Sequence, residues 1–443
     1  MSYLASSITS RTIGFVLIFW FGFFANAQAV IRDTEVENAL RVYMQPLLKA
    51  ANLADERLTI TVISDPTINA AVLPGGQIIV HTGLLTQAES PTEVAGVLAH
   101  ELGHYVNNDV LKLSGKLSLG DHNSVIGAAL GLGLSIASGD GRYLTAGIFA
   151  GKHLDHRGNL QFSRSMESGA DRRAAELLHR ANLGLAGMVA LNKRMQELHP
   201  DPEMADAKYM QTHPLTKERI DYFTHQHERL GDKAIPLGWQ NVHDRIRAKL
   251  QGFEKPPQEV LVLYPEDDTR LPAKMARSIA LMRLARFDES IDLMDSILVE
   301  HPEDGFLYDL MGDIQRLAGR PDQALQYYGE AIKRLPWAAL IRQQRAELWL
   351  KKNTPNHALA ARDDLRQALR YEPDVPVYWH SLARAYKILE SEGEADLASA
   401  EAAILQGKKP LARSLARRAK LTLNIDSAEW LRADDILQQL KKT

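Results

Sequence analysis

Apolar residues recur with a helical period in the stretch that follows residue 90. They are separated by three or four positions, as in a helix that buries one face, and are Val94, Val97, Leu98, Leu102 and Val106. Just before them, the segment Ser90-Pro91-Thr92-Glu93 reads as a capping box, with Ser90 as N-cap and Glu93 reaching back. The pattern therefore predicts a helix that begins near Ser90.

A second, longer period covers the chain from about residue 273. Pro302 and Pro336 are 34 residues apart, and Pro373 and Pro410 follow in steps of 37. Small residues recur at matching places between these prolines: Ser290, Ala324, Ala358 and Ala395 in one series, and Gly312, Ala346 and Ala383 in another. The unit from Leu310 to Pro336 resembles a tetratricopeptide repeat (TPR), in which two helices pack closely. We expect residues 273–443 to form an all-α, TPR-like solenoid.

Such an array offers a concave face that can bind an extended or partly folded protein. Its end is basic, and this charge fits either a solvated face or an anionic partner; the residues are Lys408, Lys409, Arg413, Arg417, Arg418 and Lys420. Prolines and acidic residues between residues 254 and 272 predict a linker that precedes the array.

Two further stretches are rich in apolar residues. Residues 1–29 resemble a secretory signal: Arg11 supplies a positive charge, Ile13 to Phe24 form an apolar core, and Ala27-Gln28-Ala29 is a small-residue cleavage site. We expect cleavage after Ala29 and an exported, periplasmic protein. Residues 124–151 are rich in Gly, Ala and Leu, but each arm is too short to cross a bilayer. They predict a hairpin or lid at about residues 120–160, either in the core or in peripheral contact with a membrane.

Composition removes several classes of function. The 443 residues carry a formal net charge of −3, and no basic run is interleaved with aromatic residues, so nothing indicates a nucleic-acid partner. The chain has no cysteine, which excludes disulfides and thiolate metal ligands.

The predicted helix carries the motif His100-Glu101-Leu102-Gly103-His104. Residues four apart lie on one face of a helix, so His100 and His104 can both point at a single Zn²⁺ ion. Glu101 lies beside that position, where it can hold a water molecule and take its proton. The sequence therefore predicts one zinc ion per chain and Glu101 as the catalytic base.

A catalytic zinc site needs a third protein ligand and an open position. Glu167 and Asp171 are again four residues apart in a predicted second helix. Glu167 is the predicted ligand, and Asp171 would accept the outer N–H of a ligating histidine. Ala170 would let this helix approach the first. Two other pairs, His153 with His156 and Glu176 with His179, have metal-like spacings but lack the further partners that a metal site requires.

These motifs, together with Thr212-His213-Pro214 and Arg219, resemble the HtpX-like gluzincin zinc metallopeptidases, and the repeats resemble those of the periplasmic, TPR-containing branch. The segment from Asn69 to Leu85 is similar to the strand and turn that precede the metal helix in that family. The resemblance implies an α+β, mostly helical chain, with a small sheet in a metallopeptidase domain at residues 30–253. Ala71 stands where many relatives have an aromatic residue.

Two roles remain open for His213. Pro214 biases it toward an extended backbone, and its imidazole could fill the fourth zinc position and keep the enzyme latent. Alternatively it could donate to the oxyanion of the tetrahedral intermediate, a role that the charged Arg219 could also fill. We favour the first role for His213.

Two functions follow from these predictions. In the first, the protein is an exported zinc endopeptidase that removes misfolded or stalled envelope proteins, with clients and assembly machinery bound by the repeats. A substrate would add a strand at residues 70–72 or 78–80. In the second, it is a chaperone or assembly factor with a latent or structural zinc site.

Overall fold

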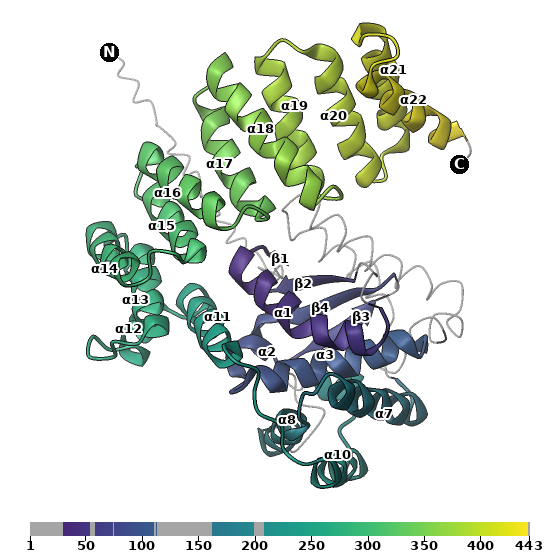
Figure 1. Cartoon of the computed structure of the whole chain (residues 1–443), viewed down its shortest axis with the longest axis vertical. Coiled ribbons are helices and arrows are strands. Elements are labelled where there is room, and N and C mark those ends of the chain that lie inside the picture. Colours follow the sequence, from purple (N-terminus) through teal and green to yellow (C-terminus); the bar gives the residue numbers. More distant parts are fainter. Residues whose placement is uncertain are drawn as a thin grey trace, which may run out of the picture.

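The computed structural model describes residues 30–53, 58–73, 75–109, 112, 162–198 and 208–441. The predicted signal peptide, the predicted hairpin at about 120–160 and the pair His153 and His156 lie outside these residues. An N-terminal unit contains a sheet, and a long array of paired helices curves beside it (Figure 1). The predicted fold class, α+β and mostly helical, is confirmed. No helix within the described ranges has the length and apolar character needed to cross a membrane.

The sheet has four strands, which lie in the spatial order β1 (Val30–Ile31), β2 (Thr59–Ile63), β4 (Gln77–His81) and β3 (Ala70–Leu73). Strands β2 and β4 are parallel, whereas β1 and β3 run antiparallel to their neighbours. Among the described strands, β3 is therefore an edge and β4 is internal. The expectation that residues 78–80 offer a sheet edge is wrong, because both sides of β4 are already paired.

The N-terminal unit contains seven described helices: α1 (Thr34–Ala50), α2 (Thr82–Gln87), α3 (Pro91–Val106), α7 (Arg164–Arg180), α8 (Ala186–Leu198), α9 (Lys208–Thr212) and α10 (Lys217–Leu230). Helix α1 begins where the Asp33 carboxylate accepts the backbone N–H groups of Glu35 and Val36. Helices α1 and α3 contact each other and the sheet. The core between them includes fully buried apolar residues of all three layers: Leu40, Tyr43, Leu47, Ile78, Val80, Leu98 and Leu102.

Helices α3 and α7 pack closely at Gly103. A Cβ atom at this position would lie 2.8 Å from the carbonyl oxygen of Ala170 on α7. Ala170 is fully buried in the same contact. The close helix contact that was predicted at Ala170 is thus made with Gly103, on the same helix that carries His100 and His104.

From α11 onward the chain is helical; the lead-in helices are α11 (Trp239–Glu254) and α12 (Pro257–Leu263). Five antiparallel pairs follow: α13 (Leu271–Arg283) with α14 (Phe287–Glu300), α15 (Gly305–Leu317) with α16 (Pro321–Arg334), α17 (Ala339–Lys351) with α18 (Pro355–Tyr371), α19 (Pro376–Ile388) with α20 (Glu392–Leu405), and α21 (Lys409–Thr422) with α22 (Ala428–Lys441). Each pair packs on the next, as in a TPR solenoid (Figure 1).

The recurring small residues lie inside these pairs. Ser290, Ala324, Ala358 and Ala395 are all buried. Gly312 is needed for a close approach, because a Cβ atom there would lie 2.6 Å from the Tyr328 ring. The segment predicted as a linker, residues 254–272, contains α12, whose Val260 is fully buried against Ala248 of α11 and Ala276 of α13.

A buried ionic network joins the N-terminal unit to the array. The Lys249 ammonium of α11 lies 2.8 Å from the Asp33 carboxylate and 3.3 Å from that of Glu35. Arg245 bridges Glu35 and Asp304, the N-cap of α15. Burial would lower the pKa of Lys249, but the charges of Asp33 and Glu35 outweigh it and raise that pKa. Every charge in this network is thus paired, as burial requires.

Helix α1 and the residues before it also face later repeats. The Arg32 guanidinium lies 2.8 Å from the Glu372 carboxylate at the end of α18. The Arg41 guanidinium lies over the Trp337 ring, 5.6 Å from its centroid. Part of the array's surface is therefore covered by the N-terminal unit of the same chain.

Candidate metal centre

Helix α3 presents His100 and His104 on one buried face. Its first turn is capped as predicted, because the Ser90 hydroxyl accepts the N–H of Thr92; the Glu93 carboxylate accepts the N–H of Glu89 instead of that of Ser90. Both histidines are fully buried, and their Nε2 atoms lie 3.1 Å apart. The i, i+4 spacing therefore brings the two rings together as expected.

Carboxylates at the outer nitrogens fix which ring atoms carry protons. His100 Nδ1 lies 3.0 Å from Asp171 of α7, and His104 Nδ1 lies 3.1 Å from Asp109. A carboxylate at this distance favours a proton on Nδ1, which leaves each Nε2 with a lone pair. When both rings are neutral, these lone pairs face each other at 3.1 Å and cannot form a hydrogen bond, so either a proton on one Nε2 or a metal ion must lie between them. The two Nε2 atoms fit a cation placed between them.

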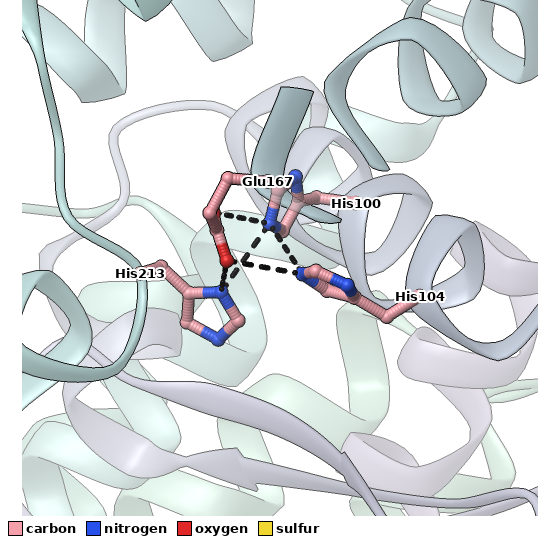
Figure 2. A group of neighbouring side chains, drawn as sticks. All are labelled: His100, His104, Glu167 and His213. Atoms are coloured by element: carbon pink, nitrogen blue, oxygen red, sulfur yellow. Dashed lines mark hydrogen bonds and ion pairs between the residues drawn. The ribbon is translucent and has the colours of Figure 1, made fainter. Parts of the chain in front are cut away.

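Glu167 and His213 complete the group (Figure 2). The Glu167 carboxylate lies 3.4 Å from His100 Nε2, 3.3 Å from His104 Nε2 and 3.0 Å from His213 Nδ1. His213 Nδ1 is also 3.4 Å from His100 Nε2. The edge of a tetrahedron of zinc ligands is about 3.3 Å for zinc–nitrogen bonds of about 2.0–2.1 Å. One ligand atom from each residue, all within 4.8 Å of one another, can thus surround a single ion.

The charge of the centre also favours the binding of a cation. Of four buried carboxylates, Glu101, Asp109, Glu167 and Asp171, Asp109 pairs with the exposed Lys112, and the guanidinium of Arg219 is the buried cation beside Glu167 and Asp171. Burial would raise the pKa of Glu167, but its contacts with three histidines hold that pKa well below the usual range. Uncompensated negative charge is costly in a buried site. The donor set and the charge balance therefore both fit a divalent metal ion.

Glu101 lies between the ligand cluster and the edge strand. Its Oε2 atom accepts the backbone N–H of Val72 on β3 at 2.9 Å. Its Oε1 atom is buried, and in the described part of the chain it has no hydrogen-bond partner. That free oxygen lies 3.5 Å from His213 Nε2. The arrangement can hold one oxygen of the base in place while the other is available for proton transfer.

His213 lies just after α9, on the opposite side of the centre from α3. It is fully buried, and its backbone N–H donates to the carbonyl of Tyr209 at 2.8 Å. Burial lowers the pKa of its imidazole, which favours the neutral form that a metal ligand requires. The structure thus places His213 in the ligand cluster and beside Glu101 at the same time.

Arg219 of α10 orients the residues that surround the metal position. Its guanidinium makes two hydrogen bonds with Asp171, at 2.6 and 2.8 Å, and lies 2.8 Å from Glu167. A further bond of 3.0 Å goes to the carbonyl of Pro214, next to His213. Most of its donors are therefore engaged in orienting Glu167, Asp171 and the turn at Pro214. Glu176, by contrast, forms an ion pair with Arg173 at the surface and takes no part in the cluster.

Three residues of the centre were not predicted. Asp109 orients His104 from the loop after α3, and its only signal in the sequence is a carboxylate five positions after a ligand. Tyr209 stacks on His213 with ring centroids 4.7 Å apart, and its spacing of four residues before His213 was a usable signal. Phe162 stacks on His104 at 4.0 Å. Nothing in the local sequence around Phe162 indicates this contact.

Comparison with known proteins identifies the domain that holds this centre. Residues 34–226 match peptidase family M48. A putative beta-barrel assembly-enhancing protease of Vibrio cholerae is 26% identical over 65% of this chain, and the alignment spans 60% of that relative's length, less than two thirds. The beta-barrel assembly-enhancing protease of Escherichia coli strain K12 is 21% identical over 89% of this chain and 81% of its own.

A third relative matches a smaller share of the chain. The human mitochondrial metalloendopeptidase OMA1 is 28% identical over 40% of this chain and 33% of its own. The motifs on α3 and α7 lie inside residues 34–226, the range that matches family M48, and the repeats lie outside it. The chain therefore carries a metallopeptidase domain of family M48 at residues 34–226, followed by an array of TPR-like helical repeats.

Proposed function

We propose that the protein is a zinc-dependent endopeptidase that uses His100, His104 and Glu167 as ligands and Glu101 as the base. The observation that carries this proposal is the pair of histidine Nε2 atoms that face each other 3.1 Å apart beside the Glu167 carboxylate. Two imidazoles and one carboxylate form a donor set that zinc commonly takes in hydrolytic sites. The membership of the domain in a metallopeptidase family supports the same choice of metal.

The residues around the centre have distinct tasks in hydrolysis. A bound zinc ion would polarise the scissile carbonyl and make water acidic enough to attack at neutral pH. The free Oε1 of Glu101 takes the proton of the attacking water and passes it to the leaving amine. The Val72 N–H holds the other oxygen of Glu101, so the base keeps its orientation through both transfers. An extended substrate would pair with β3, the edge strand that adjoins Glu101.

The relatives and the rest of the chain support a proposal for the substrate class. We infer that misfolded or stalled envelope proteins are the clients, since two similar proteins are named for the assembly of β-barrels. Residues 1–29 resemble an export signal, which would place the protein in the periplasm. The repeats would bind clients or assembly machinery through surfaces that the N-terminal unit leaves uncovered. On α21, the exposed Lys409 and Arg417 would offer such a surface to an acidic partner, whereas Arg418 and Lys420 already pair with Asp396 and Asp434.

A specific observation favours a second function. His213 lies within ligand distance of the same centre, and four protein ligands are typical of closed, structural zinc sites. On this alternative, the protein is a chaperone or assembly factor, and the zinc site is latent or structural.

The variant Glu101→Gln separates the two functions. It keeps the shape and the Val72 bond but cannot accept a proton, so peptide hydrolysis should fall on the order of a hundredfold or more. Zinc content should stay near one per chain, whereas Glu167→Ala should lose zinc. The assay uses an unfolded protein such as casein, with metal analysis of each variant and Asp221→Asn, an exposed carboxylate, as control. Undiminished cleavage by Glu101→Gln would reject Glu101 as the base.

A further inference from the structure

The imidazole of His213 is held by two aromatic side chains that come from different parts of the chain. The ring of Tyr209 lies 4.7 Å from it at an interplanar angle of 28°, and the ring of Phe162 lies 5.2 Å from it at 24°. Both are buried, with 3% of Tyr209 and 9% of Phe162 exposed. Both rings therefore lie nearly parallel to the imidazole and in contact with it.

Backbone hydrogen bonds tie these rings to the turn that carries His213. The carbonyl of Tyr209 accepts the N–H of His213 at 2.8 Å, and the N–H of Phe162 donates to the carbonyl of Thr212 at 3.4 Å. Phe162 also stacks on the ligand His104 at 4.0 Å and 15°. The rings are therefore fixed relative to the centre, and His213 cannot turn away without losing both contacts.

The position of His213 decides whether Glu101 can work. With His213 in place, its Nε2 lies 3.5 Å from the free oxygen of Glu101 and its Nδ1 lies 3.0 Å from Glu167. The imidazole thus occupies the space between the base and the ligands, where an attacking water must stand. In the gate role of His213, in which the imidazole fills the fourth zinc position, the site turns over only while the imidazole is elsewhere.

We propose that Phe162 and Tyr209 form an aromatic clamp, a pair of positioning residues that hold His213 at the metal and set how often it leaves. This inference rests on the proposed function. A stacked aromatic pair contributes about two- to tenfold to an equilibrium constant. Loss of either ring should therefore raise the fraction of enzyme in the open arrangement by about that factor.

The stacked ring of Tyr209, not its hydroxyl, carries the effect. That hydroxyl is buried and has no hydrogen-bond partner among the residues that the structure describes, so it makes no bond that holds His213. The variant Tyr209→Phe keeps the ring and removes only the hydroxyl, and it should behave like the wild type within about twofold. Tyr209→Leu removes the stack but keeps an apolar side chain in the site.

The test uses the full chain loaded with zinc for kinetics and with Co²⁺ for spectroscopy. The visible absorption of Co²⁺ reports its coordination number, which a general loss of stability does not change. Tyr209→Leu should shift the Co²⁺ spectrum toward that of His213→Ala. It should also raise kcat about two- to tenfold with little change in KM. Phe162→Leu should act in the same direction, with its metal content checked because Phe162 also touches His104.

Two comparisons make the result specific. Tyr328 is a fully buried tyrosine in the repeats, and Tyr328→Leu should leave the spectrum and short-peptide turnover unchanged. In a His213→Ala background, Tyr209→Leu should have no further effect, because the side chain that the clamp holds is gone.

Three outcomes would overturn the clamp. The first is a wild-type spectrum and wild-type turnover in both leucine variants. The second is an equal gain in kcat when Tyr209→Leu is made in the His213→Ala background. The third is reduced turnover with an unchanged spectrum. Failure of the proposed function can be distinguished from failure of the clamp. If Glu101 is not the base, hydrolysis persists when Glu101→Gln is added to any of these variants. If Tyr209→Leu fails to fold, Phe162→Leu tests the loss of a stacked ring, and Tyr209→Phe remains the variant that keeps the ring.

Discussion

At the scale of single residues, the outer contacts of the histidines matter as much as the histidines themselves. Asp171 and Asp109 lie at the Nδ1 atoms of His100 and His104 and leave both Nε2 atoms free for a metal ion. Arg219 in turn holds Asp171 and Glu167. The ligands are therefore oriented before any ion arrives, which lowers the cost of binding it.

His213 gives the sharpest test at this scale, because its two candidate roles predict opposite signs. If the imidazole fills the open position, His213→Ala raises peptide turnover, by about the factor by which the closed form outweighs the open one. If it stabilises the oxyanion, the same change lowers kcat with little effect on KM. We expect the rise, and hydrolysis rates at matched zinc occupancy measure it. A large loss of turnover would reject the gate.

Zinc affinity should depend on pH through His100. Burial would lower the pKa of His100, but Asp171 and Glu167 raise it from 6.5 to about 9 in the metal-free protein. Zinc must displace that proton, so apparent affinity should increase about tenfold per pH unit up to about pH 9 and then level off. In the apoprotein, the raised pKa stabilises the fold fully below about pH 6.5, and this stability is lost as pH rises through about 9.

Competition with a chelator across this pH range measures the effect. The matched variant is Asp171→Asn, which removes the charge that raises the pKa of His100 and should flatten the dependence. An affinity that does not change between about pH 7 and about pH 9 would contradict the assignment.

Sequence patterns can predict the site residues that lie on one face of the same helix. His100 with His104, and Glu167 with Asp171, are each one helical turn apart, so the period of a helix is enough to pair them. Phe162 and Asp109 meet His104 only through the packing of separate segments, and no period in the sequence encodes that contact. His213 combines both situations. Its motif was recognisable in the sequence, but its position among the ligands depends on the fold.

At the scale of elements, the closeness of α3 and α7 sets the geometry of the metal centre. Gly103→Ala would place a methyl group 2.8 Å from the carbonyl oxygen of Ala170, a backbone atom that cannot turn aside. Helix α7 must then shift and carry Glu167 away from the histidines. We expect a loss of about 1–3 kcal/mol in stability and a weaker zinc site, although alanine is the better helix former.

Gly169→Ala is the matched control on the same pair of helices. A Cβ atom at Gly169 would meet only the side-chain nitrogen of Asn107, at 3.3 Å, which can move. Thermal unfolding and chelator competition of the two variants separate close packing from helix propensity. Equal zinc affinity in Gly103→Ala and Gly169→Ala would show that α7 tolerates the shift.

The sheet marks a limit of sequence-based prediction at this scale. The runs at residues 70–72 and 78–80 both read as strands, and nothing in either run says which is internal. Strand order is fixed by β2, which pairs in parallel with β4 and leaves β3 at the edge. The repeats were easier to predict because each helix pair contacts mainly its neighbours along the chain.

At the scale of the whole molecule, the N-terminal unit and the array share helix α11. It packs on α2 of the first unit and on α13 of the second, and Gly252 of α11 touches Ile279 of α13. A chain that ends at Phe253 would keep α11 but lose the partners of Arg245 and Arg32 in the array. The sequence predicted a boundary at this point, and the structure places shared packing across it.

We still expect the truncated protein to fold, because the metal centre and its core lie entirely within residues 30–253. It should bind zinc and cleave short peptides, with stability reduced by about 1–3 kcal/mol through the loss of buried ion-pair partners. It should process folded client proteins poorly. Metal content, thermal unfolding and the two kinds of substrate measure these effects. Aggregation with loss of zinc would instead assign the array a supporting role.

The ion pair between Arg32 and Glu372 joins residues that are 340 positions apart in the chain. A ribosome makes these residues at about 5–20 per second, so the first partner waits on the order of a minute or less for the second. Helix α1 can take its place in the core of the N-terminal unit early, but the ion pair between Arg32 and Glu372 can form only after most of the repeats exist. The contacts that join the N-terminal unit to the later repeats are thus among the last to form, after the unit itself can already be folded.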